Sequence, residues 1–301
     1  MYAATIAGDH QVANYSVQLA HGKQLLLNRP KVMAIINLSS DSFSSQGRFL
    51  ETQKAVDYAC QAVADGADII DIGAEPTNPS IHSPASEITE LERLVPMLEA
   101  LVPQIKVPIS IDTSRPEVMQ ACLEMGAHLI NDVRGLCMPG ALNVAARMNA
   151  GICMMHMRYP DGIPDTGLVF SNKEYLSEIK NFLASRVESA IECGVDPQQI
   201  ILDPGIGYGS FGKSTQQNCG ILQNLAFFQD LGYPLLIGAS RKTFIGEILQ
   251  HTEDKRVAGS ISAAVVAALQ GAHILRVHDV RQTVDALKVA RAIIDEGKIN
   301  E

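Results

Sequence analysis

The sequence predicts an α/β protein folded as a (β/α)8 barrel, preceded by a short β-hairpin. Three observations lead to this prediction. Eight short runs rich in Val, Ile and Ala recur along the 301 residues, and segments with helical periodicity separate them. The runs are apolar almost throughout, as in strands that are buried on both faces of a parallel sheet. Eight strand–helix units in roughly 270 residues match the number and size of this barrel.

The whole chain, 1–301, is predicted to form one domain, with residues 1–30 as an extension ahead of the barrel. Within this extension, the segment SVQLAHGKQLLL predicts a β-hairpin that turns at His21 and Gly22. A doubly wound open sheet is the alternative fold, but no G-x-G-x-x-G follows the first strand. The eight expected barrel strands are 32–37, 67–72, 107–112, 128–132, 151–156, 199–203, 234–238 and 272–276.

Helical periodicity predicts the segments that connect these strands. Four glycines follow such segments at positions where helix C-caps are expected, namely Gly66, Gly126, Gly194 and Gly271. The expected helices are 53–64, 87–101, 116–125, 142–148, 172–193 and 257–269.

Composition argues against several classes of protein. The net charge of −9 and the pI of about 5.4 disfavour a nucleic-acid partner and an anionic membrane surface. No apolar run approaches the roughly 18 residues of a membrane span, and the N-terminus lacks the features of a signal peptide. The six cysteines form no C-x-x-C pair, which predicts reduced core side chains and a cytoplasmic protein.

The residues that end the predicted strands indicate the active site, because in this barrel it forms at the C-terminal ends of the strands. Carboxylates and an amide suit a flat heterocycle with several N–H donors. The cations suit a phosphate or a diphosphate, and Asn37 with Asp41 offers oxygen ligands for Mg²⁺. The strand-end residues are Asn37, Asp71, Asp112, Asn131, Asp132, His156, Asp203, the group Ser240, Arg241 and Lys242, Arg276 and His278.

Eight motifs, collinear over roughly residues 31–290, resemble the dihydropteroate synthase family. Each motif is weak alone, but eight in the right order are highly specific. They are NLSSDSFS (37–44), DIGAEPTNP (71–79), ISIDTSRPEV (109–118), LINDVRG (129–135), MHM (155–157), ILDPGIGYG (201–209), GASRKTFIG (238–246) and LRVHDV (275–280).

The resemblance implies a transferase that joins 6-hydroxymethyl-7,8-dihydropterin diphosphate to p-aminobenzoate in folate biosynthesis, giving 7,8-dihydropteroate and diphosphate. It implies Mg²⁺ as cofactor, held by Asn37. It also implies sulfonamide inhibitors and a homodimer formed through helices away from the barrel mouth, such as the one that contains 261–269.

The resemblance further implies roles for individual residues. The pterin would lie against Asp112, Asn131, Asp203 and Lys242. The diphosphate would be held by Asn37, Arg276 and His278. The p-aminobenzoate would lie near Phe43, Thr77, Lys242 and Thr243. The implied catalytic residues are Asp112, Asp203, Lys242, Arg276 and His278.

The second loop departs from the family pattern, since Pro76 stands where a serine is usual and Asn78 where an arginine is usual. A pterin-binding paralogue with weak or no synthase activity is therefore an alternative. A methyltetrahydrofolate–corrinoid methyltransferase is another, but it would not need Ser-Arg-Lys and Arg-x-His.

Several of these residues also have a plain structural interpretation. Asp71 and Asp132 could accept backbone N–H bonds, and Asp112 could cap the helix that begins near Pro116. His156 is expected to be a core histidine, and Lys213 does not have the glycine spacing of a phosphate-binding loop.

Overall fold

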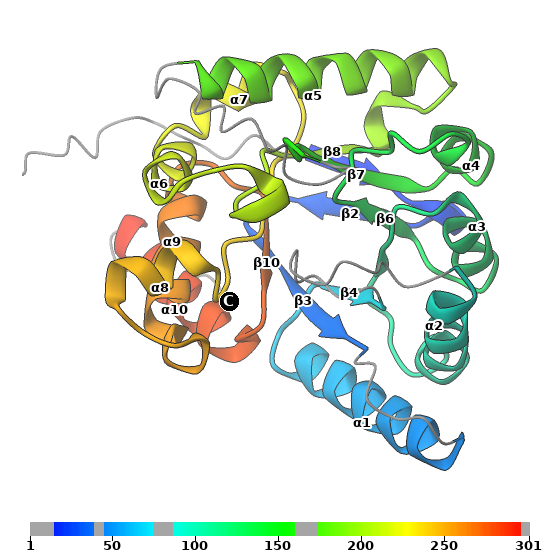
Figure 1. Cartoon of the computed structure of the whole chain (residues 1–301). Coiled ribbons are helices and arrows are strands. Elements are labelled where there is room, and N and C mark those ends of the chain that lie inside the picture. Colours follow the sequence, from blue (N-terminus) through cyan, green and yellow to red (C-terminus); the bar gives the residue numbers. More distant parts are fainter. Residues whose placement is uncertain (1–14, 39–44, 75–86, 160–173, 296–301) are drawn as a thin grey trace, which may run out of the picture.

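A ring of parallel strands surrounded by helices forms the body of the protein (Figure 1). The computed structural model describes residues 15–38, 45–74, 87–159 and 174–295. The eight-stranded sheet has the order β8-β7-β6-β5-β4-β3-β10-β9. A parallel bridge between Leu202 and Leu235 joins its two ends. The strands are β3 (Lys31–Asn37), β4 (Ile69–Gly73), β5 (Ile109–Asp112), β6 (Leu129–Asp132), β7 (Gly151–Met155), β8 (Ile200–Asp203), β9 (Leu236–Ile237) and β10 (Ile274–Val277).

The predicted (β/α)8 barrel is therefore confirmed, and the open-sheet alternative is wrong. Helices lie on the outside of the ring. They are α1 (Ser45–Ala64), α2 (Glu87–Leu101), α3 (Pro116–Glu124), α4 (Ala141–Arg147), α5 (Tyr175–Glu192), α6 (Thr215–Gln223), α7 (Ala226–Gln229), α8 (Thr243–Leu249), α9 (Val257–Leu269) and α10 (Val280–Ile294). Within the ranges that the structure describes, no helix has the length and apolarity that crossing a membrane requires.

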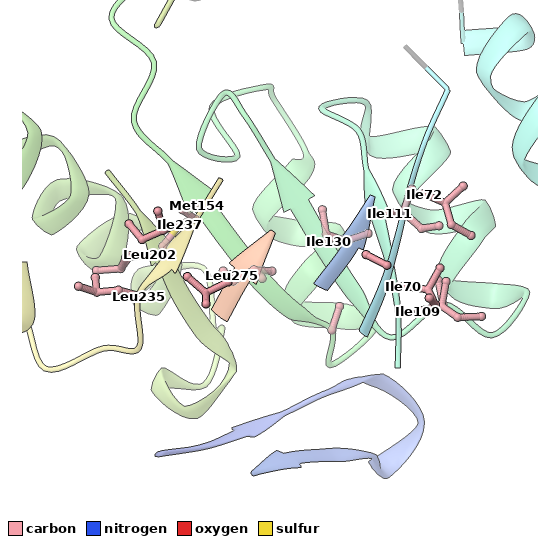
Figure 2. Packing of buried hydrophobic residues seen from close by; sticks show 14 of the residues in the cluster. Ile70, Ile72, Ile109, Ile111, Ile130, Met154, Leu202, Leu235, Ile237 and Leu275 are labelled. Atoms are coloured by element: carbon pink, nitrogen blue, oxygen red, sulfur yellow. The ribbon is translucent and has the colours of Figure 1, made fainter. Parts of the chain in front are cut away.

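The side chains of each strand alternate between the helices and the barrel interior, as the two-residue period of a strand requires. Outward-facing residues such as Ile70, Ile111 and Leu275 form the main core beneath the helices (Figure 2). Because this layer takes the outward-facing residues of the strands, the alternate positions fill the barrel and line its mouth.

The predicted hairpin is confirmed and closes the N-terminal end of the barrel. It consists of β1 (Tyr15–Gln18) and β2 (Gln24–Leu27), which are antiparallel, and the turn places His21 and Gly22 at positive φ. The hairpin residues Val17, Leu19, Leu25 and Leu27 share a cluster with the inward residues Met33, Ile69, Leu129, Cys153, Ile201, Leu236 and Ile274. A Cβ on Gly151 would lie 2.4 Å from Leu19 Cδ2, so the hairpin fits closely at this point.

Helix boundaries differ from the sequence prediction in a few places. The helix α1 begins at Ser45 rather than near residue 53, and the strand β9 forms over two residues instead of five. The four expected C-cap glycines all have positive φ, between 90° and 108°. The cysteines are free thiols, but Cys137, Cys193 and Cys219 are exposed, so the expectation of core thiols is wrong for these three.

Candidate active site

Neighbouring strands present one row of polar residues at the mouth of the barrel. The pairing register places Asn37 beside Gly73, Gly73 beside Asp112, and Asp112 beside Asn131. These residues belong to the C-terminal ends of β3, β4, β5 and β6, and Asp203 ends β8. Because inward-facing positions recur in step on neighbouring parallel strands, the register brings the side chains of Asn37, Asp112 and Asn131 to one level.

Arg276 on β10 is the central cation of this mouth. Its Nε donates to Asp71 Oδ2 at 2.6 Å, and its Nη2 donates to Asp112 Oδ2 at 2.7 Å. Asp71 is fully buried and also accepts from Ser110 Oγ at 2.5 Å and from Asn131 Nδ2 at 3.3 Å. Burial would lower the pKa of Arg276, but Asp71 and Asp112 outweigh burial and raise this pKa above the usual range.

Asn37 and Asp112 lie on either side of Gly73. A Cβ on Gly73 would lie 3.4 Å from Asp112 Cβ, 3.7 Å from Asp112 Oδ2 and 3.8 Å from Asn37 Oδ1. A carboxylate oxygen and an amide oxygen therefore both border the space above Gly73 at the mouth of the barrel. Glycine at this position leaves that space open.

Asp203 and Lys242 form the second half of the mouth. Asp203 Oδ1 accepts from the Gly205 N–H at 2.7 Å. Burial raises the pKa of Asp203, and Lys242 is the strongest of the groups that oppose this rise. Lys242 Nζ donates to the Ile206 carbonyl and lies 4.8 Å from the centre of the Phe211 ring.

Gly238, just after β9, lies between Lys242 and Arg276, which belong to the two halves of the barrel mouth. A Cβ on Gly238 would lie 3.9 Å from Lys242 Nζ and 3.9 Å from Arg276 Cδ. Asp112, Asn131, Asp203, Lys242 and Arg276 therefore surround one region of the barrel mouth.

The ammonium group of Lys242 has a pKa of about 8, because burial lowers it and Asp203 only partly offsets that effect. If a ligand needs this ammonium group, its affinity should fall as the pH rises through about 8. We expect Lys242→Arg to move this alkaline limb upward, since a guanidinium stays charged. Calorimetry of ligand binding to the native protein and to Lys242→Arg between pH 6 and 10 checks this. An alkaline limb at the same pH in both proteins would contradict the assignment of the limb to Lys242.

His278 lies beside this region, on the segment that follows β10. Its Nδ1 is 3.0 Å from Ser240 Oγ, and its carbonyl accepts from Tyr58 Oη at 3.0 Å. Burial, with Arg241, Arg276 and Lys242 nearby, lowers the pKa of His278 to about 4. The imidazole is thus neutral at pH 7 when no anion is bound.

An ion pair fixes the two segments that carry Lys242 and His278. Arg241 donates to both carboxylate oxygens of Asp279, at 3.1 and 2.6 Å. Arg241 has a φ of 57°, and its carbonyl accepts from Arg256 Nη1 at 2.9 Å. Because Arg241 precedes Lys242 and Asp279 follows His278, this pair sets the spacing between the two predicted ligand-binding groups.

Other predicted residues have structural roles or lie apart. Asp132 accepts from Ser114 Oγ and from the N–H groups of Arg134 and Leu136, so the structural interpretation is correct. Asp112 does not cap α3, whose N-cap residue is Arg115. His156 is a buried histidine packed edge-on against Phe182, as expected.

Of the four residues predicted to lie near p-aminobenzoate, the structure describes Lys242 and Thr243. Thr243 is exposed at the start of α8, next to Lys242. Phe43 and Thr77 lie outside the described residues, as do Asp41, Pro76 and Asn78.

Two contributors to the site were not predicted from the sequence: the carbonyl of Ile206 and the ring of Phe211, which contact Lys242. Asp71 and Ser240 were predicted as strand-end residues, but not their contacts with Arg276 and His278. The pairing of Asp71 with Arg276 depends on closure of the ring, which no local motif shows. Phe211 had a visible signal, a single aromatic residue between glycines in YGSFGK.

Comparison with known proteins agrees with this geometry. A family model described as pterin binding enzyme matches residues 33–278. Dihydropteroate synthase of Escherichia coli K12 is 40% identical over 276 residues, covering 91% of this chain and 95% of its own. The chain belongs to the dihydropteroate synthase family. A dihydropteroate synthase of Xanthomonas albilineans superposes with a TM-score of 0.82 at 39% identity, covering 92% of this chain and 98% of its own.

A second solved member of the dihydropteroate synthase family, from Yersinia pestis, has a TM-score of 0.82 at 38% identity, and covers 92% of this chain and 98% of its own. Membership of the family explains why the eight motifs fall where they do. The motifs 109–118, 129–135, 201–209, 238–246 and 275–280 supply Asp112, Asn131, Asp203, Lys242 and Arg276, which the structure brings together.

Proposed function

We propose that this protein is a dihydropteroate synthase, a transferase that condenses 6-hydroxymethyl-7,8-dihydropterin diphosphate with p-aminobenzoate. The observation that carries the proposal is the convergence of Asp112, Asn131, Asp203, Lys242 and Arg276 at the barrel mouth of a chain from this family. The Xanthomonas albilineans relative has been solved with 4-aminobenzoic acid and with 7,8-dihydropteroate.

The pterin would bind between the two halves of the mouth. A carboxylate can accept two N–H bonds from the amino–imino edge of a pterin, and Asp203 is the carboxylate with the strongest electrostatic effect on Lys242. Asn131 offers an amide that can both donate and accept. Asp112 is held in place by Arg276, so it faces the ring with a fixed orientation.

The diphosphate would lie towards Arg276 and His278. The guanidinium group uses Nε and Nη2 for Asp71 and Asp112, and its Nη1 donates to no other residue in the described part of the chain. Nη1 is thus the group that Arg276 can offer to an anion. His278, neutral at pH 7 in the ligand-free protein, would contribute a hydrogen bond, and a bound anion would raise its pKa.

The residues at Gly73 suit a Mg²⁺ ion that is shared with a diphosphate. Mg²⁺ prefers oxygen ligands and typically takes one or two from the protein and others from substrate phosphates and water. The amide oxygen of Asn37, which lies beside Gly73, is a ligand of this type, and Asn37 would hold the ion. A bound Mg²⁺ would neutralise charge on the diphosphate and so make it a better leaving group.

The protein would act mainly by orientation and electrostatics. The bond between the pterin methylene carbon and the diphosphate oxygen breaks, and the electron pair leaves with the diphosphate. Arg276 and His278 would stabilise that charge, and the anionic Asp112 and Asp203 would steady the cationic ring. The neutral amine of p-aminobenzoate then forms the new C–N bond and loses a proton. No covalent intermediate with a protein side chain is needed.

Diphosphate release tests the proposal directly. We expect release from the pterin diphosphate to require p-aminobenzoate and to fall when Mg²⁺ is removed by a chelator. Tight pterin binding without amine-dependent release would instead favour the non-synthase paralogue. That alternative arose from Asn78, and the comparisons, which find dihydropteroate synthases, lend it no support.

Sulfonamides are the inhibitors we propose for the p-aminobenzoate subsite. The Yersinia pestis relative has been solved as a sulfonamide drug complex. Inhibition that p-aminobenzoate relieves competitively would support this subsite, and inhibition insensitive to p-aminobenzoate would count against it.

A homodimer through α9 and α10 is also proposed, since both helices expose apolar side chains. Val266 and Leu269 on α9 and Val289 and Ile293 on α10 are 42–74% exposed. We expect Val289→Glu with Ile293→Glu to convert a dimer into a monomer in sedimentation velocity, because it places two charges in an apolar contact. Ile88→Glu on α2, 69% exposed, is the matched control and should keep the native mass. A native protein of monomer mass would contradict the proposal.

A cytoplasmic location is proposed for the protein. Its six free cysteines are compatible with a compartment that keeps thiols reduced. Fractionation of cells that express the full chain would test the location, and recovery in a secreted fraction would overturn it.

A further inference from the structure

A buried lysine that the proposed reaction does not use lies just behind the pterin region. Lys213 follows the segment 206–211 that leads from β8 towards α6, and only 4% of its surface is exposed. Its Nζ lies 3.0 Å from His156 Nδ1, and it donates to the carbonyls of His156 at 3.2 Å and Phe211 at 3.0 Å. An ammonium has three N–H donors, so these three acceptors match its charged form.

The contact with the Lys213 ammonium group determines which ring nitrogen of His156 carries the proton. Nδ1 of His156 must be unprotonated to accept from Lys213, and burial together with Lys213 and Arg158 lowers the pKa of His156 to about 2. The proton of the neutral ring is then on Nε2, which lies 3.8 Å from Glu178 Oε1. Arg158 in turn binds Glu178 and donates to the Gly212 carbonyl at 3.1 Å.

Lys213 is connected to the site through the segment 206–211. Both ends of this segment contact a lysine, because Lys242 Nζ binds the Ile206 carbonyl and Lys213 Nζ binds the Phe211 carbonyl. The ring of Phe211 lies under Lys242. The Lys213 N–H also donates to the Gly207 carbonyl at 3.3 Å. The backbone around Lys213 therefore sets the position of the groups that hold Lys242.

Gly205 shows how closely this arrangement is packed. A Cβ on Gly205 would lie 2.0 Å from the His156 carbonyl oxygen and 3.1 Å from Lys213 Nζ. The Gly205 N–H is also the donor to Asp203. Asp203, His156 and Lys213 thus meet at one glycine, and a shift of Lys213 would move the backbone that orients the carboxylate.

We propose that Lys213 is a positioning residue for pterin binding: its ammonium group ties the segment 206–211 to the end of β7, next to the Gly205 N–H that orients Asp203. This inference rests on the proposed function. The charged and titratable groups that face Lys213 are Asp203, Lys242, Arg158, Glu178 and His156. Burial lowers the pKa of Lys213 to about 7, and Asp203, the strongest electrostatic partner in the set, opposes this and favours the ammonium form.

Loss of the Lys213 charge has a predictable effect on Asp203. Lys213 is one of the groups that hold down the pKa of Asp203 against burial. Without this charge, the carboxylate takes up a proton at a higher pH. Because a pterin needs the ionised form, its binding should be lost at higher pH as the solution is acidified. A residue that only filled space would not move this acid limb.

The test compares Lys213→Met, Lys213→Arg and the control Lys180→Met, which removes a partly exposed lysine paired with the exposed Asp230. Calorimetry measures the Kd for 6-hydroxymethylpterin from pH 4 to 8. We expect Lys213→Met to raise the Kd about tenfold or more, as for loss of a charged hydrogen-bond group, and to shift the acid limb upward. Lys213→Arg should restore the limb, and Lys180→Met should match the native protein.

If Lys213→Met does not fold, Lys213→Gln replaces it, since Gln keeps a donor without the charge. A folded neutral variant with the native Kd and the native acid limb would overturn the inference. Failure of the proposed function is a separate result, because the native protein itself would then bind no pterin and release no diphosphate.

Discussion

Asp203→Asn is expected to weaken the affinity for a dihydropterin by about 10- to 100-fold, the usual effect of losing a charge-assisted hydrogen bond. Asparagine keeps an oxygen that can accept from the Gly205 N–H, so the turn after β8 should be preserved. Its NH2 group, however, would place a donor against the N–H edge of the pterin. The loss should therefore fall on binding rather than on folding.

A second effect should accompany the loss of affinity. Asp203 is the strongest of the groups that favour the charged form of Lys242. Removing its charge should lower the pKa of Lys242 below about 8, so the alkaline limb of the remaining binding should move to lower pH. Asp285→Asn, which changes an exposed carboxylate paired with Arg281 on α10, is the control for both measurements. Native affinity in Asp203→Asn would remove Asp203 from the pterin site.

Arg276→Met is expected to destabilise the protein by about 3–5 kcal/mol, because it leaves a buried carboxylate without its cation. Asp71 is 0% exposed, and its other partners, Ser110 and Asn131, are neutral. Turnover should also be lost, since the guanidinium group that would stabilise the departing diphosphate is missing. Urea unfolding followed by circular dichroism measures the stability, and diphosphate release measures the turnover.

The double variant Arg276→Met with Asp71→Asn separates the two effects. Removing both charges avoids an unpaired carboxylate at the fully buried Asp71, while Asp112 still loses Arg276, so the unfolding midpoint should recover part of its native value. Turnover should not recover, because the guanidinium group is still missing. Arg276→Met with a native midpoint would mean that Asp71 does not depend on Arg276, and recovery of turnover in the double variant would exclude Arg276 from the reaction.

The fold could be predicted because its pattern is local and repeated. The strands β5 and β6 are apolar runs that end in a polar residue, and each precedes a helix with a recognisable end, as at Gly126. The helices α6 and α8 received no predicted bounds, although α6 begins with a capping box between Ser214 and Gln217. The end of β9 was misplaced because hydrogen bonding, not hydrophobicity, decides how far such a short strand extends.

The site could be predicted in part for the same reason. Inward positions at strand ends follow from the barrel, so Asp112, Asn131 and Asp203 were identifiable from their place in each run. The contact of Asp71 with Arg276 joins residues 205 positions apart, and it depends on the neighbouring strands β3 and β10. The contact of the Ile206 carbonyl with Lys242 cannot be predicted from residue type, because every residue has a backbone carbonyl. The sequence around Lys213 resembles only a phosphate-binding loop, whose glycine spacing it lacks, and gives no sign of the contact with His156.

The most direct measurement is a crystal structure of the protein with 6-hydroxymethyl-7,8-dihydropterin diphosphate and Mg²⁺. We expect density for the pterin ring between Asp112, Asn131, Asp203 and Lys242, and density for the diphosphate next to Arg276 and His278. The chain has another hollow, of about 280 Å³, at the hairpin end of the barrel between Tyr15 and Tyr233. Density for the pterin in that hollow, with the barrel mouth empty, would contradict the account.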